Sequence, residues 1–184
     1  TAPDLLNALN HVLTHAGLEE VDLQTVAGMI GHGAKAMIRQ GMAHQNMTPS
    51  EAELETLFAR FLVYYSQHIS VGSRPFDKAP EILDELAAAG AILSVCTNKK
   101  QDLSDQLLDA PGLAPRFAAI LGADSVPSKK PDGDHIVRAV LAAGGDPARA
   151  IRVGDSRTDE RAARNAGLPF IFVPFGYEAE SVEA

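Results

Sequence analysis

Two carboxylates, Asp155 and Asp159, have a spacing that suits the binding of a cation. The apolar run at 150–153 is ended by Gly154 and Asp155, and residues 158–165 have helical composition, which predicts a strand, a tight turn and a helix. Asp155 is then expected at the carboxyl end of a buried parallel strand, where open α/β sheets bind ligands, with Asp159 one helical turn further on. Carboxylate oxygens there suit Mg²⁺. The structural alternative is an Asp that caps the helix, followed by a solvated helical acid.

Composition narrows the classes of protein and partner. A chain of 184 residues, 46% of them hydrophobic, can form one α/β core with a smaller insert. Its net charge of −8 excludes nucleic acid and anionic membrane surfaces as main partners. The single cysteine, Cys96, allows no internal disulfide and is typical of a reducing cytoplasm, where we expect the protein. There is neither an apolar run of membrane-spanning length nor a signal-peptide pattern.

The first part of the chain, residues 1–76, is predicted to be a small helical domain. Apolar residues recur at helix spacing in 4–16, 22–29 and 34–44, with Gly31, His32 and Gly33 forming a break before the third segment. The run Thr48-Pro49-Ser50-Glu51 signals the start of a long helix that should continue to about residue 69. Nothing in residues 1–70 alternates as a strand does.

From residue 77 to 184 the pattern predicts an α/β domain. Helices are expected at 81–89, 100–110, 132–143 and 158–165, and strands at 91–96, 117–121, 150–153 and 170–173. Strands separated by helices form a Rossmann-like parallel sheet with helices on both faces.

Polar residues follow three of these strands in the same relative place. Thr97 and Asn98 follow the first strand, Lys130 comes after the second, and Asp155 ends the third. Because parallel strands end at one edge of a sheet, these groups should surround a phosphoryl group with donors and positive charge. Each has a structural alternative: Thr-Asn after a strand is commonly a helix cap, and Lys-Pro is commonly a solvated turn.

Three motifs resemble those of the haloacid dehalogenase superfamily. They are Ser94 to Lys99, Ser128 to Asp132 and Val153 to Asp159, and the helical segment before them looks like the small cap of that superfamily. The segments at 1–4, 31–34, 74–76 and 162–167 are most similar to the phosphoglycolate phosphatase branch.

The resemblance implies an Mg²⁺-dependent phosphoric monoester hydrolase with an α/β core and a helical cap. Thr97 and Asn98 would bind phosphate, Lys130 would hold phosphate and nucleophile, and Asp155 would ligate the metal. Asp159 would orient the metal site. Gly31, His32 and Gly33 would face the organic part of a small phosphorylated metabolite such as 2-phosphoglycolate, although a simple turn explains His32 equally well. The protein would be a monomer or a homodimer.

The sequence departs from this superfamily at the nucleophile. Its members begin with a strand ending in Asp-x-Asp-Gly-Thr, which the 184 residues do not contain, so the first core strand and the attacking Asp are expected upstream of Thr1. The chain alone should then be inactive and poorly soluble. The alternatives are a non-catalytic phosphate-binding or interaction protein that has lost the nucleophile, and a phosphatase of this superfamily for a sugar phosphate or pyrophosphate.

Overall fold

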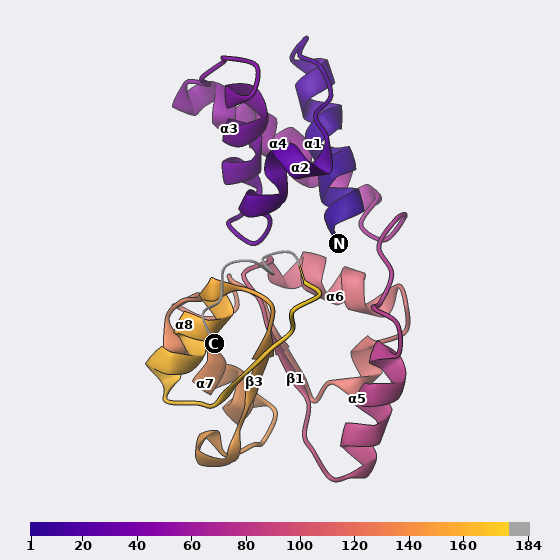
Figure 1. The fold of residues 1–184 in the computed structure, drawn as a ribbon, viewed down its shortest axis with the longest axis vertical. Helices are drawn as coiled ribbons and strands as arrows, with labels where there is room; N and C mark the ends of the chain where they lie inside the picture. The colour runs from indigo at the N-terminus through magenta and orange to yellow at the C-terminus, as the bar shows by residue number, and fades with distance from the viewer. Residues whose placement is uncertain (177–184) are drawn as a thin grey trace. The chain divides into compact units, whose positions relative to one another are not determined.

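The structure is a computed structural model that describes residues 1–176 (Figure 1). The chain divides into two compact units, Thr1–Arg74 and Pro75–Ala184. No helix within residues 1–176 is long and apolar enough to cross a membrane.

The first unit is helical throughout its described length. It comprises α1 (Ala2–His15), α2 (Leu23–Val26), the 3₁₀ turn η1 (Ala27–Met29), α3 (Ala34–Ala43) and α4 (Glu51–Gln67). The expected capping box is present but lies two residues later than the Thr48 and Glu51 pattern predicted: the Ser50 side chain accepts from the Glu53 backbone N–H, and the Glu53 carboxylate accepts from that of Ser50. Helices α1, α3 and α4 pack on one another around fully buried side chains that include Leu9, Leu13, Met37, Ile38, Leu54, Phe61 and Tyr65.

A buried carboxylate joins the two ends of the helical unit. Asp4, in the first turn of α1, accepts hydrogen bonds from the backbone N–H groups of Gly72 (2.7 Å) and Ser73 (2.8 Å). The Ser73 hydroxyl donates to the same carboxylate at 2.5 Å. Burial alone would raise the pKa of Asp4, but these hydrogen bonds lower it below its usual value. The carboxylate therefore stays charged and fixes the start of α1 against the segment that follows α4.

The second unit alternates helices and strands as the pattern predicts. Its elements are α5 (Ala79–Ala88), β1 (Ser94–Cys96), α6 (Gln101–Asp109), the 3₁₀ turn η2 (Ala114–Arg116), β2 (Ala119–Leu121), α7 (Gly133–Ala142), the 3₁₀ turn η3 (Pro147–Arg149), β3 (Arg152–Gly154), α8 (Arg157–Ala166) and β4 (Phe170–Phe172).

The strands form two parallel pairs. Strand β1 pairs with β2, with Val95 opposite Ile120, and β3 pairs with β4, with Val153 opposite Ile171. Helix α7 packs on β1 and β2, α8 packs on β3 and β4, and the two helices pack on each other. A single core joins the pairs through Cys96, Ile136, Ala139, Ala162 and Leu168. Within the described residues β1 and β3 do not hydrogen-bond to each other as strands.

The expectation that the strands are buried is wrong for one face of the β3–β4 pair. Val153 and Ile171 are each 52% exposed, and Ile151 and Ile92 are each 58% exposed. Residues 91–93 and 150–151, which the sequence assigned to strands, lie outside β1 and β3. Helices α7 and α8 cover one face of the strands. The side chains of Val153 and Ile171 point to the opposite face, where few residues pack on them.

Candidate active site at the ends of the strands

The backbone after β1 presents Thr97 and Asn98 beside the segment that carries Lys130. The Thr97 N–H donates to Leu121 O at 3.0 Å, which continues the β1–β2 ladder, and the Lys99 N–H donates to the Thr97 hydroxyl at 3.2 Å. The Asn98 amide Nδ2 donates to the Lys130 carbonyl at 2.9 Å. The expected convergence of the first and second polar segments is therefore present in the structure.

Lys130 reaches Asp159 from the loop between β2 and α7. Its Nζ donates to Asp159 Oδ1 at 2.7 Å, and the side chain is 10% exposed. The peptide bond between Lys130 and Pro131 is cis, and Asn165 Nδ2 on α8 donates to Pro131 O at 2.8 Å. Burial lowers the pKa of Lys130, and repulsion from Arg152 lowers it further, against the attraction of Asp159.

Asp159 is the centre of a buried charged cluster. Its Oδ1 accepts from Lys130 and from Arg152 Nη2 (2.6 Å), and its Oδ2 accepts from the Ser156 hydroxyl at 3.0 Å. Burial would raise the pKa of Asp159, but the charges of Arg152 and Lys130 outweigh it and lower the pKa to about 2. This carboxylate is therefore ionised throughout the physiological range.

Asp159 can occupy this position because residue 154 is a glycine. A Cβ on Gly154 would lie 2.5 Å from the Cβ of Asp159, closer than two side chains can approach. Ser156 caps α8 by accepting from the Asp159 N–H, so the capping role that Asp155 had as an alternative belongs to its neighbour.

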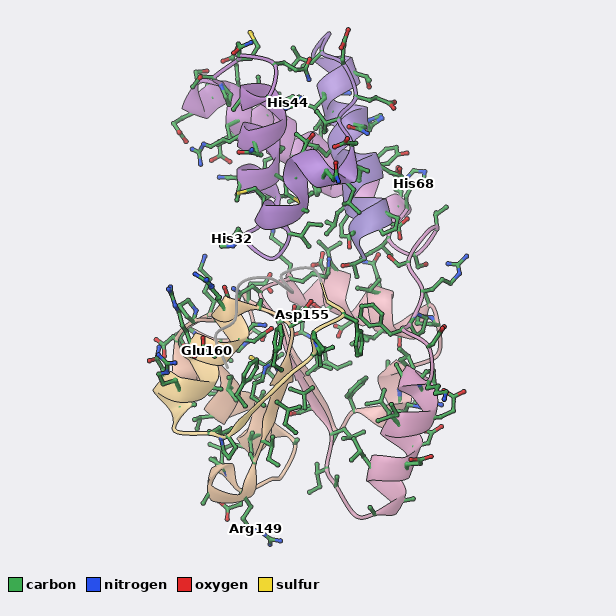
Figure 2. The ribbon with its side chains drawn as sticks, in the orientation of Figure 1. His32, His44, His68, Arg149, Asp155 and Glu160 are labelled. Carbon is green, nitrogen blue, oxygen red and sulfur yellow. The ribbon has the colours of Figure 1, made fainter. Side chains whose placement is uncertain are left out.

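Asp155 lies at the carboxyl end of β3, in the place expected from the sequence (Figure 2). It is half-buried, and the chain after β4 approaches it so closely that a Cβ on Gly176 would lie 2.2 Å from the Asp155 Cβ. Residues 1–176 contain no group of three His, Cys, Asp or Glu side chains that could hold a metal ion. Asp155 fits as one oxygen ligand, but Asp159 is engaged by two cations, so the described residues do not complete a cation site.

Arg152 is the site residue that sequence reasoning missed. It lies on β3, two residues before Gly154, and its side chain is 15% exposed. Its Nη2 donates to Asp159 and also to Cys96 O on β1 at 3.2 Å. A charged residue inside an apolar run that is expected to be buried was the available signal, because such a charge needs a partner.

The Gly31-His32-Gly33 segment forms a turn within the helical unit. Gly31 and Gly33 have φ values of 94° and 98°, a region that side-chain-bearing residues rarely adopt, and the His32 N–H donates to Met29 O. His32 itself is exposed. The turn interpretation is therefore confirmed, whereas a role toward substrate stays a prediction.

The sequence profile of haloacid dehalogenase-like hydrolases matches residues 1–173 of the chain. The chain belongs to this hydrolase family. A phosphoglycolate phosphatase of Caulobacter vibrioides is 45% identical over 183 residues, which cover 100% of this chain and 77% of that protein. An N-acetylmuramic acid 6-phosphate phosphatase of Pseudomonas aeruginosa is 33% identical, with 96% of this chain and 77% of that protein covered.

Solved structures agree with this assignment. A predicted phosphoglycolate phosphatase from Haemophilus somnus superposes with a TM-score of 0.88 at 28% identity, covering 98% of this chain and 82% of the other. The expected superfamily, its phosphoglycolate phosphatase branch, the α/β fold and the class of phosphoric monoester hydrolase are confirmed.

Proposed function

We propose that this hydrolase cleaves a small phosphomonoester, with 2-phosphoglycolate as first candidate, through an aspartyl-phosphate intermediate. The observation that carries the proposal is the meeting of Asn98, Lys130 and Asp159, from three separate segments, at one edge of the sheet. The name of the Caulobacter relative supports the choice of substrate.

The chain's own residues suit the binding of a phosphoryl group. Thr97 and Asn98 would donate to its oxygens from the end of β1, and Lys130 would place an ammonium against them. Asp159 uses one oxygen to anchor Lys130, which leaves the remaining N–H bonds of that ammonium for phosphate. These groups would offset the charge that develops on the oxygens as the phosphoryl group is transferred.

The attacking carboxylate would come from a strand between β1 and β3, carried by residues upstream of Thr1. Support comes from the edges of β1 and β3, which do not pair with each other within the described residues. Asn98 Oδ1, which follows β1, and Arg152 Nε, on β3, are buried without a hydrogen-bond partner among residues 1–176. Buried polar atoms normally have partners, so this is where a further segment would supply them.

Asp155 would ligate Mg²⁺ together with carboxylates of that added strand. A bound cation of this kind withdraws charge from phosphoryl oxygens and holds them in place. In the complete enzyme Asp155→Asn keeps the size but removes the charge, and we expect loss of Mg²⁺ binding by calorimetry together with loss of turnover.

The substrate would be small. The helical unit offers the Gly31-His32-Gly33 turn as its candidate specificity segment, and two of these three residues have no side chain with which to contact a large ligand. The relative named for N-acetylmuramic acid 6-phosphate makes a sugar phosphate the second candidate. The acidic composition and single cysteine support a cytoplasmic protein without nucleic-acid or membrane partners.

The test compares three proteins: the 184-residue chain, the chain preceded by a strand ending in Asp-x-Asp-Gly-Thr (the extended chain), and the extended chain with its first motif Asp changed to Asn. A panel of phosphomonoesters that includes 2-phosphoglycolate, sugar phosphates and pyrophosphate is hydrolysed with Mg²⁺ present. We expect turnover only by the extended chain, highest on 2-phosphoglycolate. A preference for a sugar phosphate would change the proposed substrate but not the proposed reaction.

The second candidate function, a phosphate-binding or interaction protein without catalysis, predicts a different outcome. Phosphate would then bind to the extended chain, but no member of the panel would turn over. Activity of the 184-residue chain on its own would contradict the proposed nucleophile.

A further inference from the structure

Arg152 adds a positive charge beside the Lys130–Asp159 ion pair, which has no net charge by itself. Both cations bond to the same oxygen of Asp159, at 2.6 and 2.7 Å, so the two positive groups lie within about 5 Å of each other. Two cations share one carboxylate, and the cluster therefore has one net positive charge. Without Arg152 the Lys130–Asp159 pair would be neutral.

Two other titratable side chains beside the cluster, Cys96 and His135, do not cancel this charge. Burial raises the pKa of the Cys96 thiol, which therefore stays protonated and neutral. Burial also lowers the pKa of His135, and that ring is neutral at physiological pH. A buried positive charge is costly unless an anion is bound, and this chain carries a net charge of −8 overall.

We propose that Arg152 is a positioning residue for substrate phosphate: by sharing Asp159 Oδ1 with Lys130, it fixes that carboxylate and leaves the Lys130 charge available to the phosphoryl oxygens. The proposal rests on the proposed phosphatase function. Arg152 acts through Asp159 and need not touch the substrate.

A guanidinium donates to Asp159 from a fixed plane, whereas an ammonium has the same charge without that plane. Charge and shape can therefore be separated by substitution: Arg152→Lys keeps the charge, and Arg152→Met keeps much of the length without it.

The test measures binding of inorganic phosphate to the extended chain by isothermal titration calorimetry, so that no turnover is needed. We expect R152M to weaken phosphate binding at least about ten-fold, as loss of a nearby unit charge should. R152K should recover binding to within about three-fold of wild type. The matched control is R149M, because Arg149 is exposed and lies far from Asp155 in the same unit (Figure 2); its phosphate affinity should equal wild type.

Steady-state kinetics on the preferred phosphomonoester provide a second measurement. R152M should raise KM more than it lowers kcat, and R152K should reverse most of the rise. A residue that only supported the fold would lower the unfolding midpoint without this dependence on charge. If R152M does not fold, R152Q, which keeps a hydrogen-bond donor but no charge, takes its place under the same criteria.

Two results would overturn the role of Arg152. One is wild-type phosphate affinity in a folded R152M or R152Q protein, and the other is equally weak binding by R152K and R152M. Phosphate binding that follows the expected order without any turnover by the wild-type extended chain would support Arg152 and reject the phosphatase. Failure of the wild-type protein to bind phosphate would reject both.

Discussion

Replacing Asp159 with Asn should destabilise the second unit, because it leaves two buried cations without their shared anion. The side chains of Lys130, Arg152 and Asp159 are 10%, 15% and 7% exposed, so solvent screens them little. Breaking a buried ion pair by removing one partner costs about 3–5 kcal/mol. That is a large part of the total stability of a domain, which is about 5–15 kcal/mol.

The same carboxylate should give the stability a particular pH dependence. Its pKa in the folded protein is about 2, below the value of 3.8 for an unperturbed Asp. A lowered pKa stabilises the fold above pH 3.8 or so, and this contribution is lost as the pH falls toward 2. The shift corresponds to about 2 kcal/mol. The advantage of the wild-type protein over Asp159→Asn should therefore shrink by about 2 kcal/mol between these two pH values.

Urea unfolding at pH 7, 5, 4 and 3, followed by far-UV circular dichroism, measures both effects. The matched control is Asp134→Asn, which breaks an exposed pair with Arg138 on α7 and should cost only a small fraction of the Asp159 change. The reasoning is refuted if the two substitutions cost the same at pH 7. It is also refuted if the difference between wild type and Asp159→Asn does not shrink as the pH falls.

Two further predictions concern the packing of each unit. Gly133→Ala should destabilise the second unit by several kcal/mol, because the added Cβ would lie 2.5 Å from the Ala166 backbone nitrogen and force α7 away from α8; thermal unfolding checks this, and an unchanged midpoint would contradict it. Asp4→Asn should destabilise the helical unit by about 1–3 kcal/mol through its lost hydrogen bonds to Gly72 and Ser73. Amide hydrogen exchange at those two residues should then increase, whereas exchange in the second unit should not.

The sequence predicted the order and type of the elements because the signals were local. A capping box starts α4 as expected, although its residues are Ser50 and Glu53 instead of Thr48 and Glu51, and the alternation of helix and strand patterns from residue 77 predicted the parallel strands. The sequence also predicted that the segments carrying Asn98, Lys130 and Asp159 meet, because parallel strands end at one edge of a sheet.

What the sequence could not predict depends on contacts across the fold. The bonds from Arg152 to Asp159 and to Cys96 O join residues 7 and 56 positions apart, and neither pair has a local pattern. The role of Asp4 as a buried acceptor likewise needs Gly72 and Ser73, 68 and 69 residues away. Exposure of Val153 and Ile171 was missed because an apolar run does not say whether both faces of a strand are covered.

The bonds of Asp4 to Gly72 and Ser73 make the helical unit an interchangeable module. Asp4 in the first helix is bonded to Gly72 and Ser73 near the end of the unit, so residues 5–71 form a closed loop whose two ends lie side by side. Residues can then be added, removed or replaced inside that loop while its two ends keep their separation, and longer loops cost little additional entropy. Selection for new substrates could in this way act on the helical unit while the charged cluster of the second unit remained unchanged.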